Sequence, residues 1–205
     1  MPKKRKKPGT RRLEKRLFII CEGMKDKSES AYFKSFIKSC KFKGDKVEVK
    51  VIDTNKNTGK ELVKEAKNCK KEFPDDIAWV VYDKDGYTKH PETFDMARNN
   101  NIKIAFSSIS FEYWILIHYE YTSRPFEKSE NIISYLNSNK YISYTKASTD
   151  IYMKTKSLMN TALANAKNIK DYQAKGNSVG TPVYNFNPYT NIDELIEEII
   201  ELQNI

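Results

Sequence analysis

The sequence predicts an α/β protein built on a parallel βαβ sheet, with helices on both faces and a C-terminal helical extension. Short apolar runs occupy residues 17–21, 77–83 and 102–108, and each has the length of a buried strand. Segments with helical periodicity separate these runs. Strands that alternate with helices are typical of βαβ units, whose strands are parallel.

The first half of the chain supplies two strands and two helices. Residues 17–21, LFIIC, are continuously apolar, as expected of a strand that is buried on both faces. Residues 29–40 carry an aromatic and aliphatic face at helical spacing. Residues 46–53 alternate valine with polar residues, which predicts a half-buried or edge strand. A T-x-x-E capping box opens the amphipathic segment 58–69, so a helix is expected there.

The next segments repeat this alternation. Residues 77–83, IAWVVYD, predict a second buried strand, and residues 91–100 a short helix. Residues 102–108 predict a further strand. Ser110 is then positioned to cap a single helix over the sequence FEYWILIHYEY, residues 111–121.

After residue 121 the pattern becomes mainly helical. Helices are expected at about 129–138, 150–169 and 191–203, and a loop rich in glycine and proline precedes the last of them. The chain is therefore divided into three parts: a basic disordered tail over 1–15, a core over 16–120, and a helical extension packed on that core over 121–205.

The positive charge is concentrated at the N-terminus. The chain has a net charge of +9, and residues 1–16 hold nine Lys and Arg against Glu14 alone. Such a tail favours polyanions, and phosphate-backbone contact and simple solubilisation both remain open. The residues expected to contact nucleic acid are Lys3, Lys4, Arg5, Lys6, Lys7, Arg11 and Arg12 of the tail, with Lys25 and Lys84 from two loops.

The cysteine and histidine content and the length of the apolar runs limit the classes of protein to which the chain can belong. Three cysteines without metal-type spacing indicate reduced thiols, and the presence of only two histidines argues against a zinc site. No apolar run approaches the roughly 18 residues of a membrane span, and no signal peptide opens the chain. A cytoplasmic protein without a membrane partner is expected.

Three acidic side chains follow two of the predicted strands. Glu22 comes directly after the first strand, and Asp83 and Asp85 end the strand that begins at Ile77. Parallel strands end at one edge of a sheet, so these acids surround one point if the two strands are neighbours. Carboxylate oxygens with water are the ligands that Mg²⁺ (or Mn²⁺) requires. The alternative is that E-G and D-x-D-G are ordinary turns.

Two further residues extend this candidate site. Glu112 begins the helix after the strand 102–108 and can face the same edge, although an acid there also suits a helix N-terminus. His118 lies six residues later, which is about 9 Å along a helix axis and on another side of it. The two residues are therefore not expected to bind one ion. His118 is either a core residue on an aromatic face or a catalytic residue.

Several motifs together resemble those of a known family. A glutamate after a first strand and D-x-D after a later one resemble the Toprim fold, and the whole pattern resembles the RloB-like family of bacterial defence and restriction loci. The segments that carry this resemblance are IICEG (19–23), S-E-x-x-Y-F (28–33), VVYDKDG (80–86), SISFEYWILIHY (108–119) and NPYTNIDELIEEI (187–199).

The resemblance implies a Toprim-like core and a metal-dependent nuclease of anti-phage or abortive-infection defence. Asp83 and Asp85 would bind Mg²⁺ or Mn²⁺, and Glu22 would be a further ligand or the general base. Glu112 and His118 are the additional catalytic candidates. RNA, including tRNA, is favoured over DNA by analogy alone, and a neighbouring ABC- or AAA-type ATPase is the expected protein partner.

Two other functions stay open. One is a non-catalytic regulatory subunit of an ATPase, which would bind a nucleotide or metal with the same acids. The other is a small nucleotide phosphatase or phosphotransferase. A homo-oligomer is compatible with all three functions.

Overall fold

Five strands form a single sheet in the order β2-β1-β3-β4-β5 in the computed structural model, which describes residues 15–22, 28–43, 46–86, 88–146 and 148–205. The pairs β1–β2, β1–β3 and β3–β4 are parallel, and β4–β5 is antiparallel. The predicted α/β class is confirmed, and the arrangement is consistent with a Toprim-like fold. The strands are Lys15–Cys21 (β1), Val47–Asp53 (β2), Ile77–Asp83 (β3), Lys103–Ser108 (β4) and Tyr189–Thr190 (β5).

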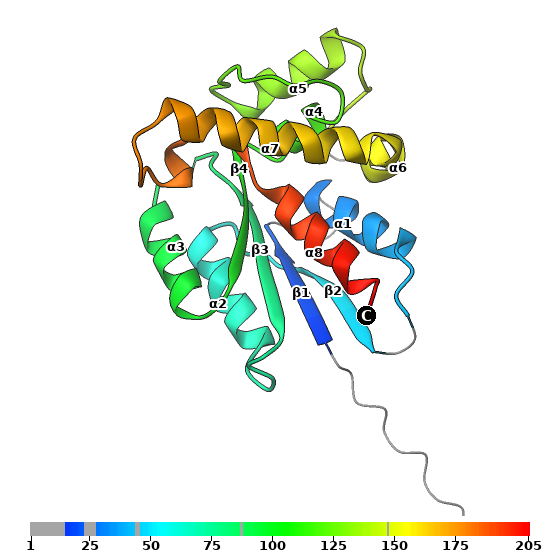
Figure 1. Ribbon diagram of the computed structural model, residues 1–205, viewed down its shortest axis with the longest axis vertical. Helices are drawn as coiled ribbons and strands as arrows, with labels where there is room; N and C mark the ends of the chain where they lie inside the picture. Colours follow the sequence, from blue (N-terminus) through cyan, green and yellow to red (C-terminus); the bar gives the residue numbers. More distant parts are fainter. Residues whose placement is uncertain (1–14, 23–27, 44–45, 87, 147) are drawn as a thin grey trace, which may run out of the picture.

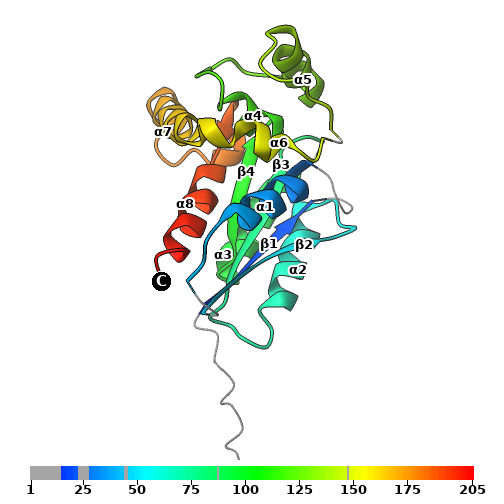
Figure 2. The same ribbon diagram turned by 90° about the vertical axis from the view of Figure 1, so that its right-hand side faces the viewer.

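Helices cover both faces of the sheet and one of its ends (Figure 1). Helices α2 and α3 lie on one face, whereas α1 and α8 lie on the other (Figure 2). Helices α4 to α7 gather beyond the end of the sheet where β3 and β4 finish. The helices are Ser28–Ser39 (α1), Gly59–Cys69 (α2), His90–Asn99 (α3), Glu112–Leu116 (α4), Ser129–Ser138 (α5), Ile151–Thr155 (α6), Met159–Gly176 (α7) and Ile192–Leu202 (α8), with 3₁₀ turns at Lys156–Leu158 (η1) and Val183–Asn185 (η2).

The interior position of strand β1 in the sheet explains why its sequence is apolar without interruption. Its side chains alternate between two cores: Leu17 and Ile19 lie in the core on the α1 and α8 side, and Phe18 and Ile20 in the core on the α2 and α3 side. Burial of one such aliphatic side chain stabilises the fold by about 1.5–3 kcal/mol. The alternating strand β2 is at the edge of the sheet and is partly exposed, as its pattern predicts.

Helix α4 is shorter than the single helix expected over 111–121. It ends at Leu116, and residues 117–119 form a turn. The carbonyl of Ile117 accepts a hydrogen bond from the Asn165 side chain of α7 at 2.9 Å, so tertiary contact replaces continuation of the helix. Ser110 gives α4 no side-chain cap, because the N-cap position falls at Phe111.

The expected helix over 150–169 consists of α6, η1 and α7, and α7 continues to Gly176. The start of α2 is as predicted, but its cap differs from a capping box. Thr58 Oγ1 donates to Glu61 Oε2 at 2.8 Å, so the two side chains bind each other rather than the backbone. No helix in the described part of the chain has the length and apolar composition needed to cross a bilayer.

Strand β5 is the element that the sequence did not predict. Tyr189 and Thr190 pair with the end of β4, and the side chain of Asn191 continues this pairing. The amide N–H of Phe106 donates to Asn191 Oδ1 at 2.7 Å, and Asn191 Nδ2 donates to the carbonyl of Ile104 at 2.9 Å. The C-terminal part of the chain therefore adds a strand to the sheet as well as helices.

Candidate active site

The strands that carry the predicted acids are neighbours in the sheet. Cys21 of β1 lies beside Val81 of β3 in parallel register. The N–H of Glu22 donates to the carbonyl of Val81 at 3.3 Å, which continues the pairing by one residue. Glu22 and Asp83 therefore leave adjacent strands at the same edge, where parallel strands place functional groups.

A cavity of about 240 Å³ lies at this edge. It brings together the four acids that the sequence singled out, and a fifth acid, Glu29, lines it as well. The acidic lining is Glu22, Glu29, Asp83, Asp85 and Glu112, and the remaining lining is Ser28, Ser110, Ser129 and Lys146.

The loop after β3 holds Asp85 at the rim of the cavity. The N–H groups of Lys84 and Asp85 donate to the carbonyls of Ser107 and Ile109 at 3.0 and 3.1 Å, so the pairing with β4 extends past the strand. Gly86 then turns the chain with φ +70°, a conformation that favours glycine. The Asp85 side chain is exposed. Partial burial lowers the pKa of Lys84, which does not line the cavity.

Two of the acids begin helices at the cavity. Glu29 lies in the first turn of α1 and Glu112 in the first turn of α4, where a negative charge is favourable. Glu112 is only 4% exposed, and the hydroxyl of Tyr144 donates to its Oε1 at 2.9 Å. This bond holds the carboxylate in place. Glu29 is part of the motif S-E-x-x-Y-F, which could have identified it. The sequence does not determine the path of the preceding loop, so it did not place Glu29 at the cavity.

Asp83 has the most perturbed environment of the acids. Burial raises its pKa well above the usual range, and the nearby carboxylates of Glu29, Glu112 and Glu22 raise it further. The backbone N–H of Phe111 opposes this effect through a hydrogen bond to the charged form. The neighbouring carboxylates thus disfavour the charged form of Asp83, and a cation would relieve that repulsion.

The donor set fits a hard divalent cation by its chemistry. Carboxylate oxygens suit Mg²⁺ and Mn²⁺, and the cavity walls also offer hydroxyl oxygens. Within the described ranges, no three His, Cys, Asp or Glu side chains converge closely enough to hold an ion directly. Mg²⁺ keeps several waters in protein sites, so carboxylates spaced around a cavity can bind it partly through water.

His118 lies in the core rather than at the cavity. Its Nδ1 is 2.8 Å from the carbonyl of Trp114, which can only accept, so Nδ1 carries the proton. Nε2 lies 3.4 Å from the hydroxyl of Tyr32. Burial lowers the pKa of His118 to about 4, which keeps the ring neutral. The ring packs edge-on against Trp114, with centroids 4.9 Å apart.

The predicted nucleic-acid contacts of the tail and Lys25 lie outside the described residues. The segment after α5 interleaves tyrosines with lysines, and these tyrosines make contacts within the fold. Tyr141 donates to Glu120 at 2.6 Å, and Tyr152 lies 2.6 Å from the hydroxyl of Ser39 on α1.

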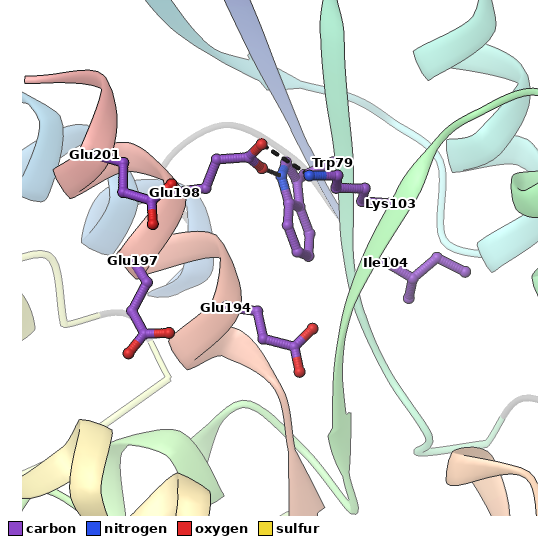
Figure 3. A pocket seen from close by; sticks show the side chains of 7 residues that line it. All are labelled: Trp79, Lys103, Ile104, Glu194, Glu197, Glu198 and Glu201. Atoms are coloured by element: carbon purple, nitrogen blue, oxygen red, sulfur yellow. Dashed lines mark hydrogen bonds and ion pairs between the residues drawn. The ribbon is translucent and has the colours of Figure 1, made fainter. Parts of the chain in front are cut away.

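A second hollow lies between α8 and strands β3 and β4 (Figure 3). Its volume is about 460 Å³. Glu198 accepts a hydrogen bond from the indole of Trp79 and pairs with Lys103 at 2.8 Å. Glu194 and Glu197 pair with lysines of α7. Each of these three carboxylates is therefore paired with a lysine.

The sequence was also compared with known proteins. A family model described as "RloB-like protein" matches residues 17–199, which is most of the chain. Comparison with curated proteins and with solved structures gave no significant match.

Proposed function

Since the chain belongs to the RloB-like family, and since its strand-end acids line one cavity, we propose that it hydrolyses nucleic-acid phosphodiesters with a divalent metal. The observation that carries the proposal is the crowding of Glu22, Glu29 and Glu112 around Asp83. We further propose RNA, including tRNA, as the substrate, a neighbouring ATPase as partner, and anti-phage defence as the setting.

Each acid has a role in this proposal. Asp83 and Asp85 would hold Mg²⁺ or Mn²⁺, and Glu22 is either a further ligand or the base that takes a proton from water. When bound, the ion polarises the phosphate and favours a hydroxide nucleophile. Glu112, fixed by Tyr144, would orient water or ligands in the cavity. His118 is assigned no step, because it does not line the cavity.

A cleavage assay tests the proposal. The full chain is incubated with a tRNA pool, single-stranded RNA, single-stranded DNA and plasmid, with Mg²⁺ or Mn²⁺ and with EDTA. We expect cleavage that needs the ion and falls to background in Glu22→Gln and Asp83→Asn. Glu72→Gln is the matched control, because Glu72 is an exposed acid outside the cavity. It should cleave as wild type does.

Other outcomes would redirect the proposal. The absence of cleavage on every substrate, with divalent binding that depends on Asp83, would favour a regulatory subunit that docks on an ATPase. Release of inorganic phosphate from mononucleotides, without internal cleavage, would favour a nucleotide phosphatase. Cleavage that persists in Asp83→Asn would reject the carboxylate site itself.

A further inference from the structure

Besides its five acids, the cavity has a polar lining to which the proposed function assigns no role. It consists of Ser28, Ser110, Ser129 and Lys146, and we call it the serine–lysine wall. The ammonium of Lys146 donates to Ser129 Oγ at 2.8 Å, and Ser28 Oγ donates to the carbonyl of Lys146 at 3.2 Å. These contacts tie the starts of α1 and α5 to the segment after Tyr144.

Ser110 is the unusual member of this wall. Its side chain is 2% exposed, and its Oγ has no hydrogen-bond partner among the residues that the structure describes. A buried hydroxyl without a partner costs free energy, and such groups in native proteins call for an explanation. Because Ser110 lines the cavity, a ligand there can supply the missing partner.

The other features of the wall favour a ligand with negative charge. Ser28 and Ser129 are the first residues of α1 and α5, which have 12 and 10 residues. The first N–H groups of a helix have no partner within it, and its N-terminus carries partial positive charge. Two helix starts, a lysine ammonium and a free hydroxyl donor favour an anion. Lys146 also faces Glu130 at 3.6 Å, at an exposed position.

We propose that the serine–lysine wall is a phosphate subsite, with Ser110 and Lys146 as donors to the non-bridging oxygens of a phosphodiester. This inference rests on the proposed function and names the group that its substrate presents. It also accounts for a lysine and a buried hydroxyl in a cavity that is lined by five acids. In this proposal the acids would bind the cation, and the serine–lysine wall would bind the phosphate.

Phosphate binding without metal tests the subsite separately from catalysis. Binding of inorganic phosphate and of dimethyl phosphate is measured by calorimetry in EDTA, in the Asp83→Asn background, where repulsion of anions is reduced. We expect about tenfold weaker binding for Lys146→Gln and about fivefold weaker binding for Ser110→Ala, as for charged and neutral hydrogen bonds. Lys64→Gln and Ser138→Ala change exposed residues elsewhere and should bind as the parent does.

Thermal unfolding separates a binding role of Ser110 from a structural one. Without ligand, Ser110→Ala should melt at the same temperature as its parent or higher, because it removes an unpaired buried hydroxyl. A fall in melting temperature, or equal phosphate binding in all four variants, would overturn the subsite. Lys146 is exposed, so its variant tests binding even if Ser110→Ala unfolds.

The two proposals can fail independently. Metal-free phosphate binding that depends on Ser110 and Lys146 supports the subsite even if no nucleic acid is cleaved. Cleavage without any effect of these variants on phosphate binding would retain the nuclease and reject the subsite. Tighter binding of dimethyl phosphate than of inorganic phosphate supports a diester ligand, and the reverse order would reject that assignment in favour of a monoester.

Discussion

Asp83 connects the electrostatics of the cavity with the stability of the fold. Its pKa is raised in the folded state, so folding favours the protonated form. The resulting stabilisation is complete below the unfolded pKa of about 3.9 and is lost as pH rises through the folded value. Above the folded-state pKa, the ionised carboxylate therefore destabilises the protein.

We expect Asp83→Asn to raise the free energy of unfolding at pH 7.5 by about 1–2 kcal/mol, as when charge is removed from a functional site. The gain should shrink as pH falls toward 4, where wild-type Asp83 is protonated. Urea unfolding across this range measures both effects. Addition of Mg²⁺ should stabilise wild type more than the variant, and an Asn variant that is less stable at every pH would refute this account.

His118 gives a pH dependence of the opposite sign. Its pKa falls to about 4 on burial, so folding favours the neutral ring. That stability is complete above the unfolded pKa of about 6.5 and is lost as pH falls toward 4, by about 3 kcal/mol in all.

His118→Gln should be less stable than wild type at pH 7.5, because it disturbs a buried side chain that bonds Trp114. The difference between the two proteins should narrow between pH 6.5 and 4.5, since the variant has no ring to protonate. Unfolding at three pH values in this interval checks the trend. A constant difference would mean that His118 does not titrate in this range.

At the scale of elements, the side chain of Asn191 bonds the backbone of β4 as the main chain of a neighbouring strand would. Asn191→Ala leaves the N–H of Phe106 and the carbonyl of Ile104 without their side-chain partner. We expect a loss of about 2 kcal/mol in the free energy of unfolding, measured in urea. Asn160→Ala, on an exposed position of α7, should change it by less than about 0.5 kcal/mol. Equal losses in the two variants would show that the side-chain contacts of Asn191 do not stabilise the fold.

Local patterns identified most elements, and the failures have physical causes. Strands β1 and β3 are apolar because they are buried on both faces, so their sequences were sufficient. Strand β5 has only two residues and exists through pairing with the distant β4, which no local pattern encodes. Helix α4 is buried on every side, so its composition could not show where a tertiary contact with α7 ends it.

The candidate site was predictable to the extent that topology determines it. Strand order places Glu22 beside Asp83, and both follow recognisable buried strands. Glu29 follows a loop whose path the sequence does not specify. The sequence predicts Ser110 as a helix cap, and its burial without a partner becomes visible only when the whole cavity is assembled. The sequence therefore indicated the acids of the cavity and not its serine–lysine wall.

At the scale of the whole molecule, charge is distributed unevenly. Seven Lys and Arg lie in residues 1–14, while the rest of the chain is almost neutral. Deletion of residues 1–14 should weaken binding to RNA and DNA alike and make binding less dependent on salt, because backbone contacts release counterions. Fluorescence anisotropy between 50 and 200 mM salt measures the slope. An unchanged slope would assign nucleic-acid contact to other surfaces, and an unchanged melting temperature would confirm an intact fold.

The direction of β1 sets a length scale for the molecule. Residues 1–14 join the fold at Lys15, whereas Glu22 follows the other end of this seven-residue strand. A strand of that length spans about 23 Å, which one nucleic-acid strand covers in about seven nucleotides. Under the proposed function, oligonucleotides shorter than this cannot touch the attachment point of the tail and the cavity together. The length of β1 would then set a minimum substrate length, and turnover would rise stepwise once oligonucleotides exceed about seven nucleotides.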